Sequence, residues 1–394
     1  MSTHSETRPV TFLTEDRLAI QTMVREFVAK DVLPVANELD PVQGEIPMEL
    51  RDKMAELGFF GILIPEEFGG LGLGVSEYAI VVEELARGWM SVASLIARGQ
   101  QFAHGFSAGQ REQYLPRMAR GEFLSAFALS EAEAGSDVAN ISCRAEREAD
   151  GGWRITGQKM WCTFADGSDY LQVFARTEPV DPAHRSHGIT CFLMPKERGT
   201  LPAGVTGNPV RKIGYHGWKT WELAFDEARV EPGMVVGEEG RGFRVAMGDL
   251  VIARIHTAAR AIGLARGALE DSISYAATRV QFGRPIADKQ AIRFKIADMA
   301  TRIEASRALL HRVCADHDAG APRDQLNLQA SMVKLHATEM AEHVTSEGIQ
   351  IHGGAGYTTD FAAERYWRDA RLTKIFEGTS EIQMKIISDT LLGR

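Results

Sequence analysis

Cysteine is scarce in this chain of 394 residues, and its four copies form no recognisable motif. None of them occurs at CxxC spacing, and none joins histidines at zinc-finger spacing. The sequence therefore gives no indication of a metal site. Reduced, structural thiols are typical of cytosolic proteins, so we expect a cytoplasmic protein without a bound metal.

Long apolar runs and blocks of positive charge are also missing. No apolar stretch approaches the ~20 residues that a membrane-spanning helix needs, and residues 1–9 lack the apolar core of a signal peptide. Acidic side chains outnumber basic ones by 53 to 44, which gives a net charge of −9. This balance disfavours nucleic-acid binding. We expect neither a membrane nor a nucleic acid as a partner.

The complete dinucleotide-binding pattern G-x-G-x-x-G is absent as well. The nearest match, Gly70–Gly74, falls short of it, so a Rossmann domain is only weakly indicated. We find no internal repeat and no low-complexity segment. A composition of 44% hydrophobic and 25% charged residues is that of an ordinary globular chain, and its length suffices for two or three domains.

Helical periodicity dominates the first part of the chain. Apolar residues recur at helical spacing between Leu18 and Val28, and Glu77–Trp89 and Gln110–Met118 are further helix candidates. We expect residues 1–125 to form an N-terminal helical domain.

Residues 126–236 show a different pattern, in which short aromatic and β-branched runs alternate with Gly, Pro and Asp. A small antiparallel barrel or sandwich is the expected structure. The candidate strands are Trp153–Gly157, Tyr170–Arg176, Gly188–Met194 and Trp221–Phe225.

Long helical patterns return in residues 237–394 and predict a four-helix bundle. The expected fold class is therefore mainly α, with a small central β domain between two helical domains. The candidate helices of the bundle are Phe243–Tyr275, Ile286–His317, Asp324–Gly348 and Ser380–Leu392.

The segment Ile375–Gln383 carries the clearest chemical signal. Glu377 is a carboxylate among apolar residues, and such a neighbourhood suits a general base. A plain helix start is the alternative, with Thr379 or Ser380 as the N-cap and Glu381 in the first turn.

Five motifs in this order resemble those of the acyl-CoA dehydrogenase family, and the likeness extends over nearly the whole chain. Two look like the family's flavin segments and two like its adenosine and pyrophosphate sites, while Ile375–Gln383 looks like its catalytic segment. The first four motifs are Phe127–Asp137, Gly157–Thr163, Arg279–Gly283 and Gln350–Gly354.

The resemblance implies an FAD site built from these motifs. Trp161 would stack on the isoalloxazine ring, although a core tryptophan is the open alternative. Arg279 and Phe282 would act on the FAD of a neighbouring subunit, which implies a homotetramer or at least a dimer. The implied FAD contacts are Phe127, Leu129, Ser130, Gly135, Ser136, Trp161, Thr163, Arg279, Gln281, Phe282, Gln350, Gly353, Gly354, Thr379 and Glu381.

The same resemblance implies substrate contacts from Ser136, Arg254 and Gly378. Arg98 falls in the segment that runs beside the acyl tail in the family, where it could pair with a substrate carboxylate or sulfinate. A surface charge at a helix end is the alternative for Arg98, and Arg87 is a weaker candidate for the same role.

By this resemblance, Glu377 removes the α-proton of an acyl-CoA thioester, and the β-hydrogen leaves as hydride to flavin N5. The product is a trans-2-enoyl thioester, as in fatty acid or amino acid catabolism, and an electron-transfer flavoprotein would accept the electrons. The alternatives are a desulfinase or oxidase of the same fold, or an acyl group bound to a carrier protein. A catalytically silent FAD-binding protein would have lost its base or its flavin contacts, and neither loss is seen.

Several positions depart from the family pattern. Glu133 lies in the flavin loop where the family has Pro-Gly, and Val251 replaces an Asp on the substrate helix. Trp218 replaces a small serine and is expected either to narrow the CoA channel or to pack against the β domain. Ala253 stands where some relatives carry the base, so Glu377 is the only base that the pattern offers.

Overall fold

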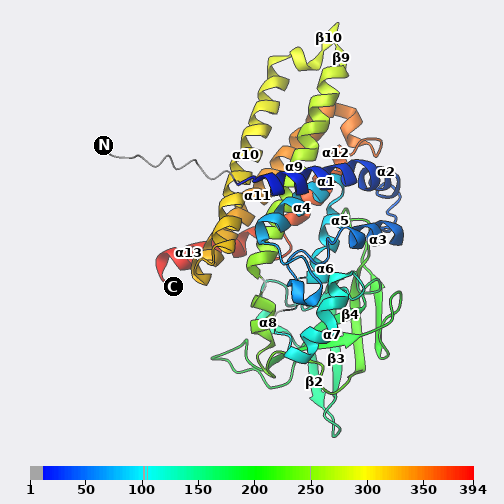
Figure 1. Ribbon diagram of the computed structural model, residues 1–394, viewed down its shortest axis with the longest axis vertical. Helices are drawn as coiled ribbons and strands as arrows, with labels where there is room; N and C mark the ends of the chain where they lie inside the picture. The colour runs from blue at the N-terminus through cyan, green and yellow to red at the C-terminus, as the bar shows by residue number, and fades with distance from the viewer. Residues whose placement is uncertain (1–11, 101–102, 104, 249) are drawn as a thin grey trace.

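The computed structural model describes residues 12–100, 103, 105–248 and 250–394, which form three regions along the chain (Figure 1). Helices come first, a sheet follows, and long helices return. The four cysteines are free and buried. Within the described residues, no group of His, Cys, Asp and Glu could hold a metal ion. Over the same residues, every helix is too short or too polar to cross a membrane.

The N-terminal region is helical, as its periodicity predicts. Its central helix, α4 (Val75–Gly88), is buried along almost its whole length because apolar residues surround it. It packs against α1 (Glu15–Phe27) and against the C-terminal helix α9. The other helices are the π-helix Val28–Val32, α2 (Leu33–Leu39), α3 (Met48–Glu56), the 3₁₀ turn Glu66–Phe68, α5 (Met90–Leu95), α6 (Ala97–Gln100) and α7 (Ala108–Ala119).

The middle region forms an eight-stranded sheet within the described residues, in the order β6-β7-β3-β2-β4-β5-β8 with β1 beside β4. β4 (Tyr170–Arg176) is buried along its whole length. A 3₁₀ turn, Val138–Asn140, lies between β1 and β2. The other strands are β1 (Ser125–Ala128), β2 (Arg144–Arg147), β3 (Trp153–Thr163), β5 (Ile189–Pro195), β6 (Val205–Pro209), β7 (Thr220–Val230) and β8 (Val235–Val236).

Two pairings correct the expectation of a purely antiparallel sheet. β1 and β2 each run parallel to β4, whereas the other described pairs are antiparallel. β1 and β2 have only four residues each. Runs this short carry too little alternation to be recognised in the sequence.

α9 (Leu250–Thr278) is the axis of the C-terminal region and contacts α10 (Gln290–Asp318), α11 (Arg323–His352) and α12 (Ala363–Thr373). The predicted bundle is present, because α13 (Ser380–Leu392) packs on α11. The helix predicted over residues 243–275 divides into α8 (Gly242–Gly248) and α9, with residue 249 outside the described residues. The remaining elements are β9 (Val280–Gln281), β10 (Arg284–Pro285) and the 3₁₀ turns Ile286–Asp288 and Gly353–Tyr357.

Candidate active site

The Glu377 loop joins α12 to α13, and its backbone is unusual. Glu377 has a φ of +54°, which non-glycine residues rarely adopt, and Gly378 follows with a φ of +89°. The Gly378 carbonyl accepts hydrogen bonds from Lys334 Nζ at 2.7 Å and Gln383 Nε2 at 2.9 Å. Thr379 caps α13, so the helix-start interpretation is also correct. The loop is thus held in place from α11 and α13.

Two residues of α9 bind the carboxylate of Glu377. Arg260 Nη2 donates to Glu377 Oε1 at 2.9 Å, and Thr257 Oγ1 donates to Oε2. Arg260 also lies over the Phe376 ring, with Cζ 4.4 Å from the ring centroid. Arg260 is 1% exposed, whereas the Glu377 side chain is 29% exposed. The carboxylate is therefore anchored from inside and accessible from outside.

Further cations surround this loop. Burial lowers the pKa of Lys334 to about 8, although nearby Glu377 raises it. Burial also lowers the pKa of Arg254 to about 10, and Arg254 Nε has no hydrogen-bond partner. The apolar setting that the sequence suggested for Glu377 is therefore incomplete. Sequence reasoning missed Thr257, Arg260 and Lys334, because nothing in the local pattern links them to Glu377.

A backbone donor lies beside the carboxylate. Within the described residues, the N–H of Glu377 donates no hydrogen bond, although the N–H groups of Ile375 and Phe376 both donate to Leu372. A strong donor without an internal acceptor is available to a ligand. A partly exposed carboxylate and a backbone N–H without an internal acceptor therefore come from the same residue.

A buried ion pair organises the loop that follows β1. Lys159 Nζ donates to Glu131 Oε1 at 2.8 Å and to the Leu129 carbonyl at 2.9 Å, while Met160 N donates to the Ser130 carbonyl at 2.8 Å. Beyond this anchor, the residues Glu133, Gly135 and Ser136 are exposed, and Phe127 is half-buried. Lys159 and Glu131 lie inside the two flavin-like motifs but were not predicted as site residues.

A bulge in β3 turns Trp161 outward. The register with β7 shifts between Lys159 and Cys162, and Trp161 has a φ of +63° and an exposed fraction of 56%. An indole this exposed is not a core residue, so the core interpretation is wrong. The neighbouring hydroxyl of Thr163 is 2.9 Å from that of Thr220. β3 therefore presents an open aromatic face, as bulges near functional sites often do.

Aromatic contacts connect this strand end to the Glu377 loop. Phe164 packs on Trp218 with ring centroids 5.6 Å apart, Trp218 packs on Tyr215 at 5.1 Å, and Tyr215 packs on Phe376 at 5.9 Å. Trp218 is 5% exposed. We expected Trp218 either to narrow the CoA channel or to pack against the β domain, and in the structure it packs against the end of that domain. The strand that carries the second flavin-like motif, β3, and the Glu377 loop thus share one contiguous region.

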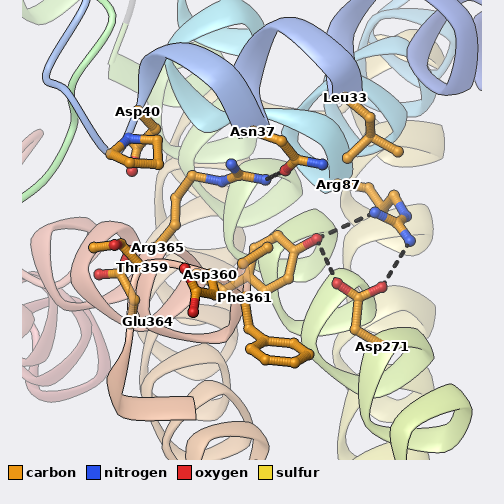
Figure 2. Close-up of a pocket in the computed structure, with 13 residues that line it drawn as sticks. Leu33, Asn37, Asp40, Arg87, Asp271, Thr359, Asp360, Phe361, Glu364 and Arg365 are labelled. Atoms are coloured by element: carbon orange, nitrogen blue, oxygen red, sulfur yellow. Dashed lines mark hydrogen bonds and ion pairs between the residues drawn. The ribbon is translucent and has the colours of Figure 1, made fainter. Parts of the chain in front are cut away.

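Arg98 and Arg87 have different surroundings. The Arg98 guanidinium lies over the Trp218 ring, 5.3 Å from its centroid, and its Nε is buried without a hydrogen-bond partner. Arg87 instead borders a separate pocket of about 290 Å³ between α2, α9 and α12 (Figure 2). There it pairs with Glu270 and Asp271 and donates to the Tyr366 hydroxyl. Arg87 is thus a structural ion-pair residue.

The remaining predicted contacts lie on a different part of the surface. The β9–β10 hairpin stands at the end of α9 that is remote from the sheet (Figure 1). Phe282 in this hairpin is 95% exposed, with a φ of +53°. Its exposed neighbours and those near the end of α11 are Arg279, Gln281, Gln350, Gly353 and Gly354. One chain alone does not bring these residues to Trp161.

The fold is that of a flavin-dependent oxidoreductase. Models of the acyl-CoA dehydrogenase N-terminal, middle and C-terminal domains match residues 14–122, 126–228 and 240–392. The chain belongs to the acyl-CoA dehydrogenase family.

Similar proteins extend over almost the full length. An acyl-CoA dehydrogenase of Bacillus subtilis is 38% identical, covering 97% of this chain and 99% of its own. An acryloyl-CoA reductase (NADH) of Anaerotignum propionicum is 39% identical, covering 97% and 96%. The structure of butyryl-CoA dehydrogenase from Megasphaera elsdenii superimposes with a TM-score of 0.89 at 34% identity, covering 96% and 99%.

Members of this family are FAD-dependent, and so is this oxidoreductase. The side chains fit such a cofactor. Trp161 offers an open aromatic face. A Cβ added at Gly135, Gly353 or Gly354 would meet no atom within 4 Å, so each of these backbones faces open space. The loop at Leu129 and Ser130 is fixed by Lys159 and by Met160 N.

Proposed function

We propose that this protein oxidises an acyl-CoA thioester to a trans-2-enoyl thioester, with Glu377 as the base that removes the α-proton. The Glu377 loop carries the proposal, because it combines an anchored, partly exposed carboxylate with a backbone N–H that has no internal acceptor. The α-hydrogen of a thioester is only weakly acidic, so its removal needs both groups. Bound FAD supplies the acceptor for the β-hydride.

Each group has a defined task. Each carboxylate oxygen of Glu377 accepts one hydrogen bond, from Arg260 or Thr257, and retains a lone pair for the α-proton. The N–H of Glu377 donates to the thioester oxygen as negative charge develops there. Gly378 permits the left-handed turn that exposes this N–H. Arg254 and Ser136 contact the thioester arm.

We further propose that a second subunit completes the FAD site, in a homotetramer or at least a dimer. Arg279 and Phe282 would contact the neighbour's FAD, together with Gln350 and the open backbone at Gly353 and Gly354. The support is the 95% exposure of Phe282 together with its φ of +53°, because strained backbone conformations cluster at functional sites. We also propose an electron-transfer flavoprotein as the electron acceptor, as membership of the acyl-CoA dehydrogenase family suggests.

The reverse reaction is the second candidate. The relative that is named an acryloyl-CoA reductase supports it at 39% identity. In that direction Glu377 would return a proton to the α-carbon of an enoyl thioester. The geometry of the base and the N–H serves both directions, so the acceptor or donor available to the protein decides between them.

Anaerobic titration with straight, branched, aromatic and dicarboxylic acyl-CoA thioesters tests the proposal. One class should bleach the flavin absorbance, and Glu377→Gln should keep its FAD but react at least about 100-fold more slowly. Glu304→Gln, at an exposed position on α10, is the control. A Glu377→Gln protein that reacts at the native rate would refute the assignment. FAD without bleaching by any thioester would favour a desulfinase, an oxidase or a carrier-protein substrate.

A further inference from the structure

Buried polar side chains and the half-buried Arg98 border Glu377 on the side of α5, α6 and α9. We call them the inner polar cluster, which consists of Ser94, Arg98, Tyr215, His256 and Arg260. Arg260 Nη1 donates to Ser94 Oγ at 2.8 Å. Arg98 and Arg260 both act electrostatically on Tyr215 and on His256, so the two guanidinium groups occupy the same region. The proposed reaction by itself gives a role to Arg260 as a donor to Glu377, but none to the other members of this cluster.

The inner polar cluster has more positive than negative charge. Burial, Arg260 and Arg98 lower the pKa of His256 well below its usual value, so the imidazole is neutral. Burial raises the pKa of the Tyr215 phenol, which is neutral too. Among the described residues, Glu377 is the only carboxylate that pairs with either guanidinium group. Arg98 forms no ion pair with any residue that the structure describes.

The proposed reaction removes this single counter-charge. When Glu377 takes the α-proton it becomes neutral, and Arg260, which is 1% exposed, is left without an anion. A buried cation is costly unless it is paired and hydrogen-bonded. A purely aliphatic acyl group would offer it nothing. An acyl group with its own carboxylate would replace the lost charge.

We propose that the substrate is a short dicarboxylic acyl-CoA thioester whose free carboxylate binds Arg260, with Arg98 as the second cation. This inference rests on the proposed function of Glu377. Arg260 Nη2 lies 2.9 Å from the carboxylate that must reach the α-carbon. A carboxylate bound to Arg260 therefore belongs to a chain only a few carbons long. The planar guanidinium fork is suited to a carboxylate.

The pocket in Figure 2 supplies the contrast. The side chain of Arg87 is also largely shielded from solvent, but Glu270 and Asp271 balance its charge. A guanidinium group that keeps its partners needs no ligand anion. Arg87→Gln is therefore the matched control for Arg260→Gln, since both remove one guanidinium group from the helical region.

The kinetic test compares glutaryl-CoA with two analogues that lack the charge, glutaramyl-CoA and pentanoyl-CoA. In the anaerobic half-reaction, we expect the unmodified holoenzyme to prefer glutaryl-CoA by roughly 100-fold in kcat/KM, as the loss of a partner to a buried charge implies. Arg260→Gln should abolish most of this preference, Arg260→Lys should keep part of it, and Arg87→Gln should leave it unchanged. FAD absorbance and circular dichroism report whether each variant is folded.

A binding test separates recognition from chemistry. CoA thioethers lack the carbonyl that acidifies the α-hydrogen, so they bind without reacting. By calorimetry on the holoenzyme, S-(4-carboxybutyl)-CoA should bind more tightly than S-pentyl-CoA. Arg260→Gln should remove this difference and Arg87→Gln should not.

The outcomes distinguish this inference from the proposed function. Equal rates with glutaryl-CoA and glutaramyl-CoA would overturn it, because recognition would not depend on charge. An Arg260→Gln variant that is slowed equally with glutaryl-CoA and pentanoyl-CoA would also overturn it and would assign Arg260 to the base or the enolate. Bleaching by pentanoyl-CoA without any preference would leave the dehydrogenase function intact and refute the dicarboxylic substrate. Selective binding of the carboxylated thioether without bleaching by any thioester would support the subsite and refute the dehydrogenase function.

Discussion

Replacing Lys159 by Met tests whether the buried ion pair under the flavin-like loop holds that loop in place. The Lys159 side chain is 0% exposed and that of Glu131 is 8% exposed. Without Lys159, Glu131 keeps hydrogen bonds from Ser142 N at 2.7 Å and Cys143 N at 2.9 Å. The carboxylate is therefore left only partly compensated.

The expected loss follows from these contacts. Removing one partner of a buried ion pair costs about 3–5 kcal/mol, and the surviving bonds to Glu131 place Lys159→Met near the lower end. The Leu129 carbonyl also loses its donor, at about 1 kcal/mol. We expect a total loss of roughly 3–4 kcal/mol in the free energy of unfolding, together with weaker retention of FAD.

Urea denaturation of the apoprotein and FAD fluorescence of the holoprotein are the assays. Arg144→Met is the control in the same sheet, because its pair with Glu146 is exposed at 60% and 74% and should be worth less than about 1 kcal/mol. Burial raises the pKa of Glu131, and Lys159 with the backbone donors lowers it further than burial raises it. Without Lys159 the carboxyl protonates more readily, so the loss should shrink as the pH falls. A Lys159→Met protein as stable as the Arg144→Met control would refute the reasoning.

Three further predictions concern stability and assembly. Asp318 caps α4 through Val75 N at 2.8 Å and Ser76 N at 3.0 Å, so Asp318→Ala should cost about 1–2 kcal/mol in urea denaturation. Although burial raises the pKa of Asp318, hydrogen bonds lower it from 3.8 to about 2. The stability that Asp318 contributes should therefore be present in full above pH 3.8 and be lost as the pH falls through 2. Burial lowers the pKa of His311 from 6.5 to about 4. Between these two pH values the folded protein binds fewer protons than the unfolded chain, so the free energy of unfolding should fall as the pH falls from 6.5 to 4. In His311→Phe the dependence of stability on pH should be weaker over the same range. Phe282→Ser should release FAD more easily without changing the circular dichroism, and a monomeric variant that retains FAD fully would contradict the shared site.

Local sequence patterns predicted the elements in which an apolar pattern continues over the whole element and its ends are clearly marked. α13 has the bounds that the sequence predicts, 380–392, because Thr379 caps it and an apolar run follows. β4 likewise matches its prediction, 170–176, because its run of mostly apolar and aromatic residues forms a buried strand. The strands β1 and β2 were not predicted, since their partner β4 lies elsewhere in the chain and decides their direction. Pairing of this kind depends on tertiary context.

The candidate site divides in the same way. Glu377 and Trp161 lie in contiguous motifs and could be identified in the sequence. Arg260 could not, because it is 117 residues from Glu377 and the sequence of α9 does not distinguish it from the other buried arginines of that helix, Arg254 and Arg266. Only the packing of the Glu377 loop against α9 brings Arg260 and Glu377 together. The charge balance on which the substrate inference depends is therefore a property of the tertiary structure.

Backbone strain connects these observations. Glu377, Trp161 and Phe282 all have positive φ, although each has a side chain that disfavours this region. Such a conformation costs on the order of 1–3 kcal/mol at each position and persists only where the surroundings enforce it. At Glu377 the enforcing contacts are Lys334 and Gln383 on the next carbonyl, and at Trp161 it is the bulge in β3. The chain thus accepts local strain at the residues assigned to the base, the flavin face and the neighbouring subunit, and also at Phe164 and Tyr215, two of the aromatic residues that connect β3 to the Glu377 loop.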